Sequence, residues 1–273
     1  MKKILLTTVL CLFAIFALEA QYSTLNAHSH NDYENEIPFR MAYDNHFGSI
    51  EADIWAIDGE LFVAHYQTDI KPGRTLDSLY IHPVVQIVRQ NGGKAWKDDT
   101  STLQLLIDLK TPVEPTLSIL IEKLKPYQDV FDPQINPNYV RIVISGNRPE
   151  PEEFDKYPGF IFFDGMLDRK YDEKTLKRVP LFSENLRKFT TWNGEGDIIE
   201  EEKTRIQNII DSVHSLNKKI RFWNSPDNIR AWCILMNIKV DYINTDHIKQ
   251  LADFLNNYEL YKEEYQECKT QKQ

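Results

Sequence analysis

Short apolar runs recur along the chain, and polar loops or segments of helical periodicity separate them. Several runs, such as 141–144 and 160–163, are apolar at nearly every position, which is typical of parallel strands covered on both faces. After the second run, Asp58 and Gly59 predict a tight turn and a hairpin that returns through residues 61–65. The pattern predicts eight main strands, at residues 24–30, 49–55, 103–110, 140–146, 160–165, 179–184, 220–224 and 240–245.

Helical segments are predicted between the strands, among them residues 117–124, 200–216 and 227–236. Strands that alternate with helices favour an α/β protein, and eight such units predict a single (β/α)8 barrel of the TIM type. Residues 187–192 are an alternative to 179–184 for the sixth strand. We find no internal repeat and no interdomain linker, so residues 21–273 are expected to form one domain.

The first 20 residues differ from the rest of the chain in their charge and hydrophobicity pattern. Lys2 and Lys3 precede an apolar run at 4–18, and Ala20 supplies a small residue suited to cleavage. This pattern predicts a secretory signal peptide over residues 1–20, and therefore a secreted or periplasmic protein. An uncleaved N-terminal anchor is the alternative. No other apolar run is long enough to span a bilayer, so no stable membrane insertion is expected after cleavage.

Composition narrows the range of partners. The 273 residues include 41 acidic and 32 basic side chains, and the net charge of −9 argues against nucleic acid or an anionic membrane surface. A small molecule is therefore the expected partner, and the oligomeric state is left open. Cys233 lies in an apolar segment and is expected as a buried thiol, whereas Cys268 lies in a polar tail. An exported protein can form a disulfide between them but need not do so.

Polar side chains collect at the predicted strand ends. In (β/α)8 barrels the C-terminal ends of the strands form the mouth, where catalytic residues lie. We therefore expect these side chains to meet at one end of the molecule. They are His28, His30, Glu51, Asp53, Asp108, Lys110, Ser145, Asn147, Asp164, Glu184, Asn224, Thr245 and Asp246.

Glu51 and Asp53 lie two residues apart on one predicted strand, so their side chains share a face. Two carboxylates on an apolar strand are costly to bury unless a cation lies between them. Asp108 adds a third oxygen donor, and Asn31 could add a carbonyl oxygen. Oxygen-only ligation favours one divalent cation, Mg²⁺ or Ca²⁺. Lys110 could hold a phosphate oxygen or could instead complete an internal salt-bridge cluster.

Three histidines accompany these carboxylates. His28 and His30 share one face of the first strand, with His30 nearer the mouth, and His65 follows the hairpin. Imidazole titrates near neutral pH, so two histidines that flank a metal-bound phosphodiester are suited to act as general base and general acid. We predict His30 and His65 as this pair. His28 is left either as a core residue or as a contact to substrate.

These motifs resemble those of the PLC-like phosphodiesterases. The segment His30-Asn31-Asp32-Tyr33 resembles the His-Asn-Ser-Tyr element of phosphatidylinositol-specific phospholipases C. Residues 50–65 resemble the matching segment of those enzymes. They are also similar to the Glu-x-Asp…His segment of glycerophosphodiester phosphodiesterases and sphingomyelinases D.

The resemblance extends along the chain, over about residues 24–250. Residues 106–111 are similar to the third metal-ligand strand of the sphingomyelinase D group, and residues 240–246 to the closing strand of the glycerophosphodiesterases. The opening at 28–33 also resembles that of the "altered inheritance of mitochondria" relatives.

The resemblance implies a metal-dependent phosphodiesterase acting on a glycerophosphodiester or a phospholipid-headgroup type of substrate. In its implied mechanism the metal polarises the phosphoryl group while one histidine deprotonates a neighbouring hydroxyl of the substrate and the other protonates the leaving alkoxide. A cyclic phosphate can form first. The implied metal ligands are Glu51, Asp53 and Asp108, with Asn31 as a fourth, and the implied catalytic pair is His30 and His65. Candidates for phosphate or substrate contacts are Lys110, His28 and Trp223.

Two departures and two alternatives bear on this prediction. The glycerophosphodiesterase opening has Arg-Gly after its histidine and a Pro-Glu-Asn-Thr run, and this chain has neither, so His28 also aligns as the catalytic histidine.

The first alternative is a zinc amidohydrolase that uses His28 and His30, although the middle strands lack the histidine or lysine such a site needs. The second is a non-catalytic barrel that binds a phosphorylated or carbohydrate ligand.

Overall fold

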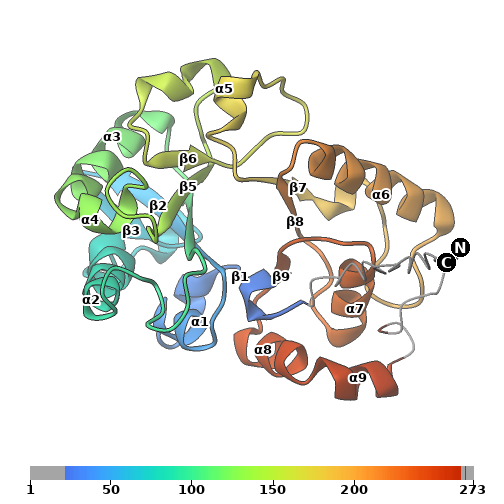
Figure 1. Cartoon of the computed structure of the whole chain (residues 1–273). Helices are drawn as coiled ribbons and strands as arrows, with labels where there is room; N and C mark the ends of the chain where they lie inside the picture. Colours follow the sequence, from blue (N-terminus) through green and yellow to red (C-terminus); the bar gives the residue numbers. More distant parts are fainter. Residues whose placement is uncertain (1–21, 266–267, 269–273) are drawn as a thin grey trace, which may run out of the picture.

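The computed structural model describes residues 22–265 and residue 268. Strands form a ring at its centre, and the helices lie outside that ring (Figure 1). The strands are β1 (Ala27–Ser29), β2 (Ser49–Ile57), β3 (Glu60–Val63), β4 (Gln104–Leu109), β5 (Arg141–Gly146), β6 (Ile161–Phe163), β7 (Leu181–Asn185), β8 (Lys219–Trp223) and β9 (Ile243–Thr245).

Helices and helical turns fill the connections between strands. The α-helices are α1 (Arg40–Asp44), α2 (His82–Gln90), α3 (Val113–Leu124), α4 (Gln128–Phe131), α5 (Glu173–Leu176), α6 (Glu200–Ser215), α7 (Ile229–Asn237), α8 (Ile248–Asn256) and α9 (Tyr258–Glu264). The shorter turns are η1 (Thr24–Asn26), η2 (Asp32–Glu34), η3 (Gln67–Asp69), η4 (Asp77–Ile81), η5 (Lys125–Tyr127), η6 (Pro151–Lys156) and η7 (Leu186–Lys188).

The parallel strands close into a barrel. One sheet has the order β6-β5-β4-β2-β1-β9, and a second pairs β7 with β8. A parallel bridge between Gly165 and Phe182 joins β6 to β7, and another between Arg221 and Tyr242 joins β8 to the segment leading into β9. These contacts complete a ring of eight parallel strands in the described part of the chain. The predicted (β/α)8 barrel is confirmed.

Side chains alternate between the lumen of the barrel and the layer under the helices. Even-numbered residues of β4 and odd-numbered residues of β5 point into the lumen, as expected for strands whose side chains alternate between faces. At the lower end of the lumen these inward positions form a separate apolar cluster, which consists of Leu106, Val143, Leu181 and Tyr242 with Phe162 packed against it. The next inward positions toward the mouth are polar. The barrel therefore has an apolar floor and a polar upper lumen.

The strand β3 is the one addition to the regular pattern. It pairs antiparallel with β2 through a turn at Asp58 and Gly59, which have φ angles of 51° and 82°. A positive φ favours glycine and Asp or Asn, so the turn sequence suits this hairpin. The Trp55 indole N–H donates to the Ala64 carbonyl at 2.9 Å, which fixes the chain leaving the hairpin just before His65.

Several predicted boundaries change. The first strand is shorter than predicted, because residues 24–26 form η1. The sixth barrel strand is β7, and the alternative at 187–192 is wrong, since that segment begins with the turn η7. The predicted signal peptide at 1–20 lies outside the described residues. No helix of the described chain is long and apolar enough to cross a membrane.

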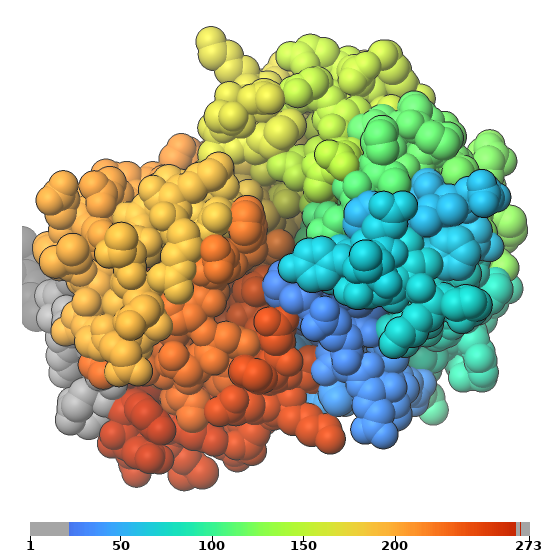
Figure 2. Space-filling model, turned by 180° about the vertical axis from the view of Figure 1, so that it is seen from behind, coloured from blue at the N-terminus to red at the C-terminus, as the bar shows by residue number. Residues whose placement is uncertain are grey.

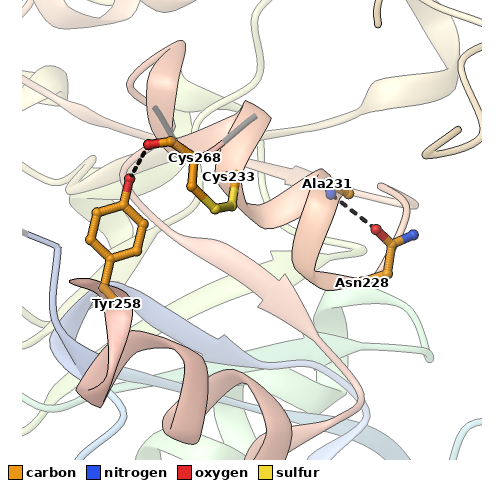
Figure 3. The surroundings of a disulfide bond; sticks show 5 residues. All are labelled: Asn228, Ala231, Cys233, Tyr258 and Cys268. Carbon is orange, nitrogen blue, oxygen red and sulfur yellow. Dashed lines mark hydrogen bonds between the residues drawn. A yellow bond between two sulfur atoms is a disulfide. The ribbon is translucent and has the colours of Figure 1, made fainter. Parts of the chain in front are cut away.

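The two later cysteines form a disulfide. Cys233 in α7 is bonded to Cys268, so the prediction of a buried free thiol at Cys233 is wrong (Figure 3). Both residues are fully buried. The Tyr258 hydroxyl donates to the Cys268 carbonyl at 2.9 Å, so Cys268 is also linked to α9.

Candidate active site

Three carboxylates gather in the upper lumen as predicted. Glu51 and Asp53 both point inward from β2, and the strand register places Asp53 beside Asp108 of β4. Glu51 and Asp53 are 5% and 1% exposed. Such burial of negative charge requires compensation close by.

Two cationic side chains supply part of that compensation. The Lys110 ammonium lies 2.8 Å from Asp53 Oδ2 and 3.0 Å from Asp108 Oδ1. Burial alone would lower the pKa of Lys110, but these two carboxylates raise it. Arg221 of β8 reaches across the lumen and donates to Glu51 Oε2 at 2.6 Å. The salt-bridge alternative considered for Lys110 is therefore present in the structure, with Asp53 and Asp108 as its partners.

The carboxylates still carry one more negative charge than these two cations neutralise. Asp53 Oδ1 is buried and has no hydrogen-bond partner among the described residues. Burial, together with Glu51 and Asp108, raises the pKa of Asp53 to about 7 despite Lys110. An unpaired oxygen in an excess of negative charge fits a divalent cation, which prefers oxygen ligands. In the described part of the chain, no three His, Cys, Asp or Glu side chains already converge in metal-ligand geometry.

His28 lies deepest of the three histidines and is fully buried. Its Nδ1 is 2.8 Å from the Ser49 hydroxyl and its Nε2 is 2.8 Å from Glu51 Oε2. Arg221 also contacts Nε2. Burial and Arg221 together lower the pKa of His28 to about 3, so the ring is neutral. This position makes His28 a support for Glu51, with both ring nitrogens engaged.

His30 lies above it at the mouth, with 24% of its side chain exposed. Its Nδ1 is 2.8 Å from Asp246 Oδ1, and its Nε2 faces Glu51 Oε1 at 3.9 Å. Burial opposes protonation, but Glu51 and Asp246 outweigh it, and the pKa of His30 is raised above its ordinary value. Asn31 lies beside this pair and donates to Asp246 at 3.3 Å.

His65 approaches the carboxylates from the other side, with 34% of its side chain exposed. Its Nδ1 is 3.3 Å from Asp53 Oδ2 and 3.2 Å from the Tyr33 hydroxyl. Tyr33 also lies within hydrogen-bond distance of Asp53 Oδ2, at 2.7 Å, and of Asn31 Oδ1, at 2.8 Å. The structure thus brings together His30, His65, Asn31 and the three carboxylates. Their catalytic and metal-binding roles stay predictions.

The candidate substrate contacts are placed differently from one another. Lys110 points into the carboxylate cluster and is partly accessible from the mouth. Trp223 ends β8 and is 38% exposed. A cavity of about 300 Å³ opens beside His65, and its walls include Tyr33, Lys71 and Arg74.

Two residues of the site were not predicted. Arg221 is the buried partner of Glu51, and the signal for it was a charged residue inside the apolar strand Ile-Arg-Phe-Trp. Tyr33 joins Asn31 to the Asp53–His65 pair, and it was noted only as part of the family motif.

Comparisons with known proteins agree with the motif resemblance. Residues 17–150 match the family model of the AIM6-like phosphodiesterase domain, just under half of the chain. "Altered inheritance of mitochondria protein 6" of Eremothecium gossypii is 25% identical over 275 residues and covers 83% of this chain and 68% of that protein. The Kluyveromyces lactis protein of the same name is 27% identical over 300 residues, covering 84% and 72%. A homolog from Arthroderma benhamiae is 26% identical over 259 residues, covering 81% of each.

Two solved structures were also found. A putative glycerophosphoryl diester phosphodiesterase from Silicibacter pomeroyi has a TM-score of 0.45 and 13% identity, covering 86% of this chain and 90% of that chain. A glycerophosphodiester phosphodiesterase from Agrobacterium tumefaciens has a TM-score of 0.46 and 14% identity, covering 85% and 96%.

The relatives overturn one prediction and confirm another. The predicted secreted or periplasmic localisation is wrong by this comparison, because the relatives include yeast proteins named for altered inheritance of mitochondria. The resemblance to the PLC-like phosphodiesterases, and to those relatives among them, is confirmed. Over residues 17–150 the chain is similar to the AIM6-like phosphodiesterase domain.

Proposed function

We propose that the chain is a metal-dependent phosphoric diester hydrolase with its active site at the mouth of the barrel. The substrate class is a small phosphodiester of the glycerophosphodiester or phospholipid-headgroup type. One observation carries the proposal. Two partly exposed histidines flank one carboxylate cluster, and a carboxylate engages Nδ1 of each. This leaves Nε2 of each ring for a proton of the substrate.

The two histidines have different roles in this proposal. Nδ1 of His65 lies 3.2 Å from the Tyr33 hydroxyl and 3.3 Å from Asp53 Oδ2, which leaves Nε2 to remove a proton from an attacking hydroxyl group or water molecule. Glu51 and Asp246 raise the pKa of His30 and so favour its protonated form, whose Nε2–H can protonate the leaving alkoxide. Asp246 holds the His30 ring in place through Nδ1.

The carboxylates supply the metal site of the proposal. Glu51, Asp53 and Asp108, with the Asn31 carbonyl, would hold one Mg²⁺ or Ca²⁺. The unpaired Asp53 Oδ1 supports this assignment. A bound divalent cation would supply Lewis-acid polarisation of the phosphoryl group. Lys110 would orient a phosphate oxygen next to the same carboxylates.

The first experiment measures hydrolysis of bis(p-nitrophenyl) phosphate and of glycerophosphodiesters with Mg²⁺ or Ca²⁺, with and without chelator. With the glycerophosphodiesters, whose alkoxide leaving groups need a proton, we expect His30→Ala and His65→Ala each to lower kcat about 10²–10⁴-fold, the usual contribution of a positioned acid or base. His214→Ala is the matched control, because His214 also pairs with an aspartate but comes from α6, away from the mouth. Full metal-dependent turnover in both mouth variants would refute the assignment.

A second experiment tests the metal ligands. The double variant Glu51→Ala and Asp53→Ala is expected to lose metal-dependent turnover and to bind Mg²⁺ or Ca²⁺ more weakly in calorimetry. Activity that persists at the wild-type level would show that the carboxylates do not hold the metal.

The zinc amidohydrolase alternative receives no support from the geometry. Such a site needs free nitrogens on His28 and His30 that face one ion. Nε2 of His28 instead contacts the Arg221 guanidinium, a fixed positive charge that repels a metal ion. The non-catalytic alternative predicts no hydrolysis under any of the conditions above.

A further inference from the structure

The lower end of the barrel lies opposite the mouth and carries three cationic side chains that the proposed active site does not use. They are Arg141 at the start of β5, Lys219 at the start of β8 and Lys218 directly before it. We call them the lower cation cluster. The chain closes around one axis, since segments from its first, middle and last parts meet around the centre of the face shown in Figure 2. Strand ends that are distant in sequence therefore gather at this end.

Two members of the cluster lie against the apolar floor of the lumen. The Arg141 guanidinium carbon is 5.8 Å from the ring centre of Phe162 and 5.8 Å from that of Tyr139. The Lys219 ammonium is 4.4 Å from the ring centre of Tyr242. Both distances are typical of cation–π contacts. Phe162 packs against the apolar cluster to which Tyr242 belongs, so both cations cover the same floor.

The third member, Lys218, is half-buried and is close enough to Arg141 to respond to its charge. Burial lowers the pKa of Lys218, and the positive charge of Arg141 lowers it further. None of the three cations forms an ion pair with a carboxylate in the described part of the chain. The Arg141 side chain makes one hydrogen bond there, from Nε to the Tyr139 hydroxyl at 3.4 Å, which leaves both of its NH2 groups for a ligand.

The absence of a counter-ion is notable because the chain has 41 acidic and 32 basic side chains. Asp241 leads into β9 next to β8, but its Oδ2 is 2.8 Å from His214 Nε2 and accepts from the Ile220 backbone N–H at 2.8 Å. Like charges that share one site repel each other unless an opposite charge lies between them. The lower cation cluster therefore indicates an anionic ligand.

The three groups also indicate which kind of anion fits. A guanidinium offers a planar pair of donors that matches two oxygens of a phosphate, and each ammonium adds a charge-assisted hydrogen bond. A phosphate monoester carries about two negative charges at neutral pH. A long polyanion would also meet the net charge of −9 of the whole chain. Since salt screens charges over about 8–10 Å, a small ligand is attracted mainly by the cluster itself.

We propose that the lower cation cluster is a second binding site, which takes a small molecule that carries a phosphate or pyrophosphate group. Such a ligand would link β5 to β8 across the seam between β6 and β7, where an isolated bridge between Gly165 and Phe182 joins the ring. Binding would therefore stabilise the closed barrel. The inference goes beyond the proposed function, because the site lies at the other end of the lumen from the mouth.

The test measures the binding of inorganic pyrophosphate to the full chain by titration calorimetry in metal-free buffer. We expect saturable binding by the wild type. The double variant Lys218→Gln and Lys219→Gln should raise the dissociation constant about 10-fold or more, because it loses two charge-assisted contacts. Arg141→Lys keeps the charge but loses the planar pair of donors, and it should weaken binding about 3- to 10-fold.

A matched control separates a specific site from a general effect of charge. The double variant Lys125→Gln and Lys156→Gln has the same net charge, but it changes lysines that already pair with Glu122 and Glu153 on outer helical turns. It should bind pyrophosphate as the wild type does. Pyrophosphate should also raise the temperature of unfolding of the wild type and of this control, but not that of the Lys218 and Lys219 variant.

Absence of pyrophosphate binding by the wild type, or equal weakening in the two double variants, would overturn the site. Association with phosphatidylserine vesicles without pyrophosphate binding would overturn its assignment to a small ligand. Hydrolysis of bis(p-nitrophenyl) phosphate by the Lys218 and Lys219 variant should stay within about 2-fold of the wild type. A chain that binds pyrophosphate here and hydrolyses no diester would support this site and refute the proposed function.

Discussion

At the scale of single residues, the site is built from histidine–carboxylate pairs that share one cluster. Asp246 lies 2.8 Å from Nδ1 of His30, and Asp53 lies 3.3 Å from Nδ1 of His65. Asp53 also forms an ion pair with Lys110. This one carboxylate therefore lies next to His65 and is also part of the candidate metal site. A change in any of these carboxylates should therefore alter the pH dependence of turnover as well as its rate.

Asp246→Asn tests the pairing of His30. Removal of this negative charge should lower the pKa of His30, because Asp246 is one of the groups that raise it. If His30 acts as the general acid, activity falls as the pH rises through its pKa, and that limb should move to lower pH in the variant. We expect kcat/KM at pH 8 to fall about 10- to 100-fold, with a smaller loss at pH 6. The pH–rate profile measures this.

The His214–Asp241 pair supplies the control for that experiment. Its two atoms are 2.8 Å apart, as in the His30–Asp246 pair. Asp241→Asn is expected to lower stability only, since Asp241 also accepts from the backbone N–H of Ile220. An Asp246→Asn profile with the wild-type limb would exclude His30 as the titrating acid.

Asp164 is a buried carboxyl whose titration should affect stability. Burial raises the pKa of Asp164 from 3.8 to about 6, although Arg148 and Arg221 oppose the shift and Asp108 adds to it. The folded state thus favours the neutral carboxyl. Its contribution to stability is complete below pH 3.8 and is lost as the pH rises through about 6. At pH 7 the wild-type chain is less stable on this account by about 3 kcal/mol.

The expected outcome is a difference between two stability curves. Urea unfolding of the wild type and of Asp164→Asn should diverge between pH 4 and pH 7, with the variant relatively more stable at the higher pH. Asp168→Asn controls for the loss of a carboxylate at the surface. Curves that stay parallel over this range would show that the Asp164 carboxyl is not held neutral.

At the scale of elements, the ends of the strands place the chemistry. Gly146 ends β5 with a φ of 68°, and a Cβ there would lie 2.6 Å from Asp108 Oδ1 and 2.6 Å from the Leu109 carbonyl oxygen. The close approach of β5 to β4 therefore requires glycine at this position. Gly59 in the β2–β3 turn has a φ of 82°, but a Cβ there would meet nothing within 4 Å.

This contrast gives a matched pair of variants. Gly59→Ala should destabilise the fold by about 1 kcal/mol, because alanine is strained at positive φ. Gly146→Ala should destabilise it more, because its Cβ would also clash with the Leu109 backbone. Only Gly146→Ala should displace Asp108, and we expect it to lower metal-dependent turnover at least 10-fold. Thermal unfolding and kcat/KM measure the two effects separately. Equal activity in the two variants would show that Asp108 tolerates displacement.

The elements also show which features the sequence could predict. The alternation in β2 placed Glu51 and Asp53 on one face, and the structure confirms this, because a two-residue period lies within a single strand. The partner of Glu51 could not be predicted, since Arg221 is 170 residues away and meets it only when the ring closes. The choice between 179–184 and 187–192 also depended on closure. Both segments contain strand-forming residues, and only the former pairs with β8.

At the scale of the whole molecule, ring closure brings residues from both ends of the chain to the proposed site. The strands β1 to β4 carry its histidines and carboxylates, while Arg221 of β8 pairs with Glu51 and Asp246, just after β9, pairs with His30. Changes in the later strands are therefore expected to affect the proposed acid–base residues. The disulfide lies outside the ring of strands, where it links Cys268 to α7.

The disulfide should therefore affect stability rather than turnover. It closes a loop across a sequence separation of 35 residues, for which a stabilisation of about 2–4 kcal/mol is typical. We expect Cys268→Ser, or reduction of the wild type by dithiothreitol, to lower the free energy of unfolding in urea by this amount. Turnover of bis(p-nitrophenyl) phosphate should stay within about 2-fold, because α7 packs outside the ring of strands (Figure 1). The double variant Cys233→Ser and Cys268→Ser should not respond to dithiothreitol. A wild-type unfolding midpoint that is equally insensitive would show that the bond does not stabilise the fold. A loss of turnover on reduction would show that the bond also affects the active site.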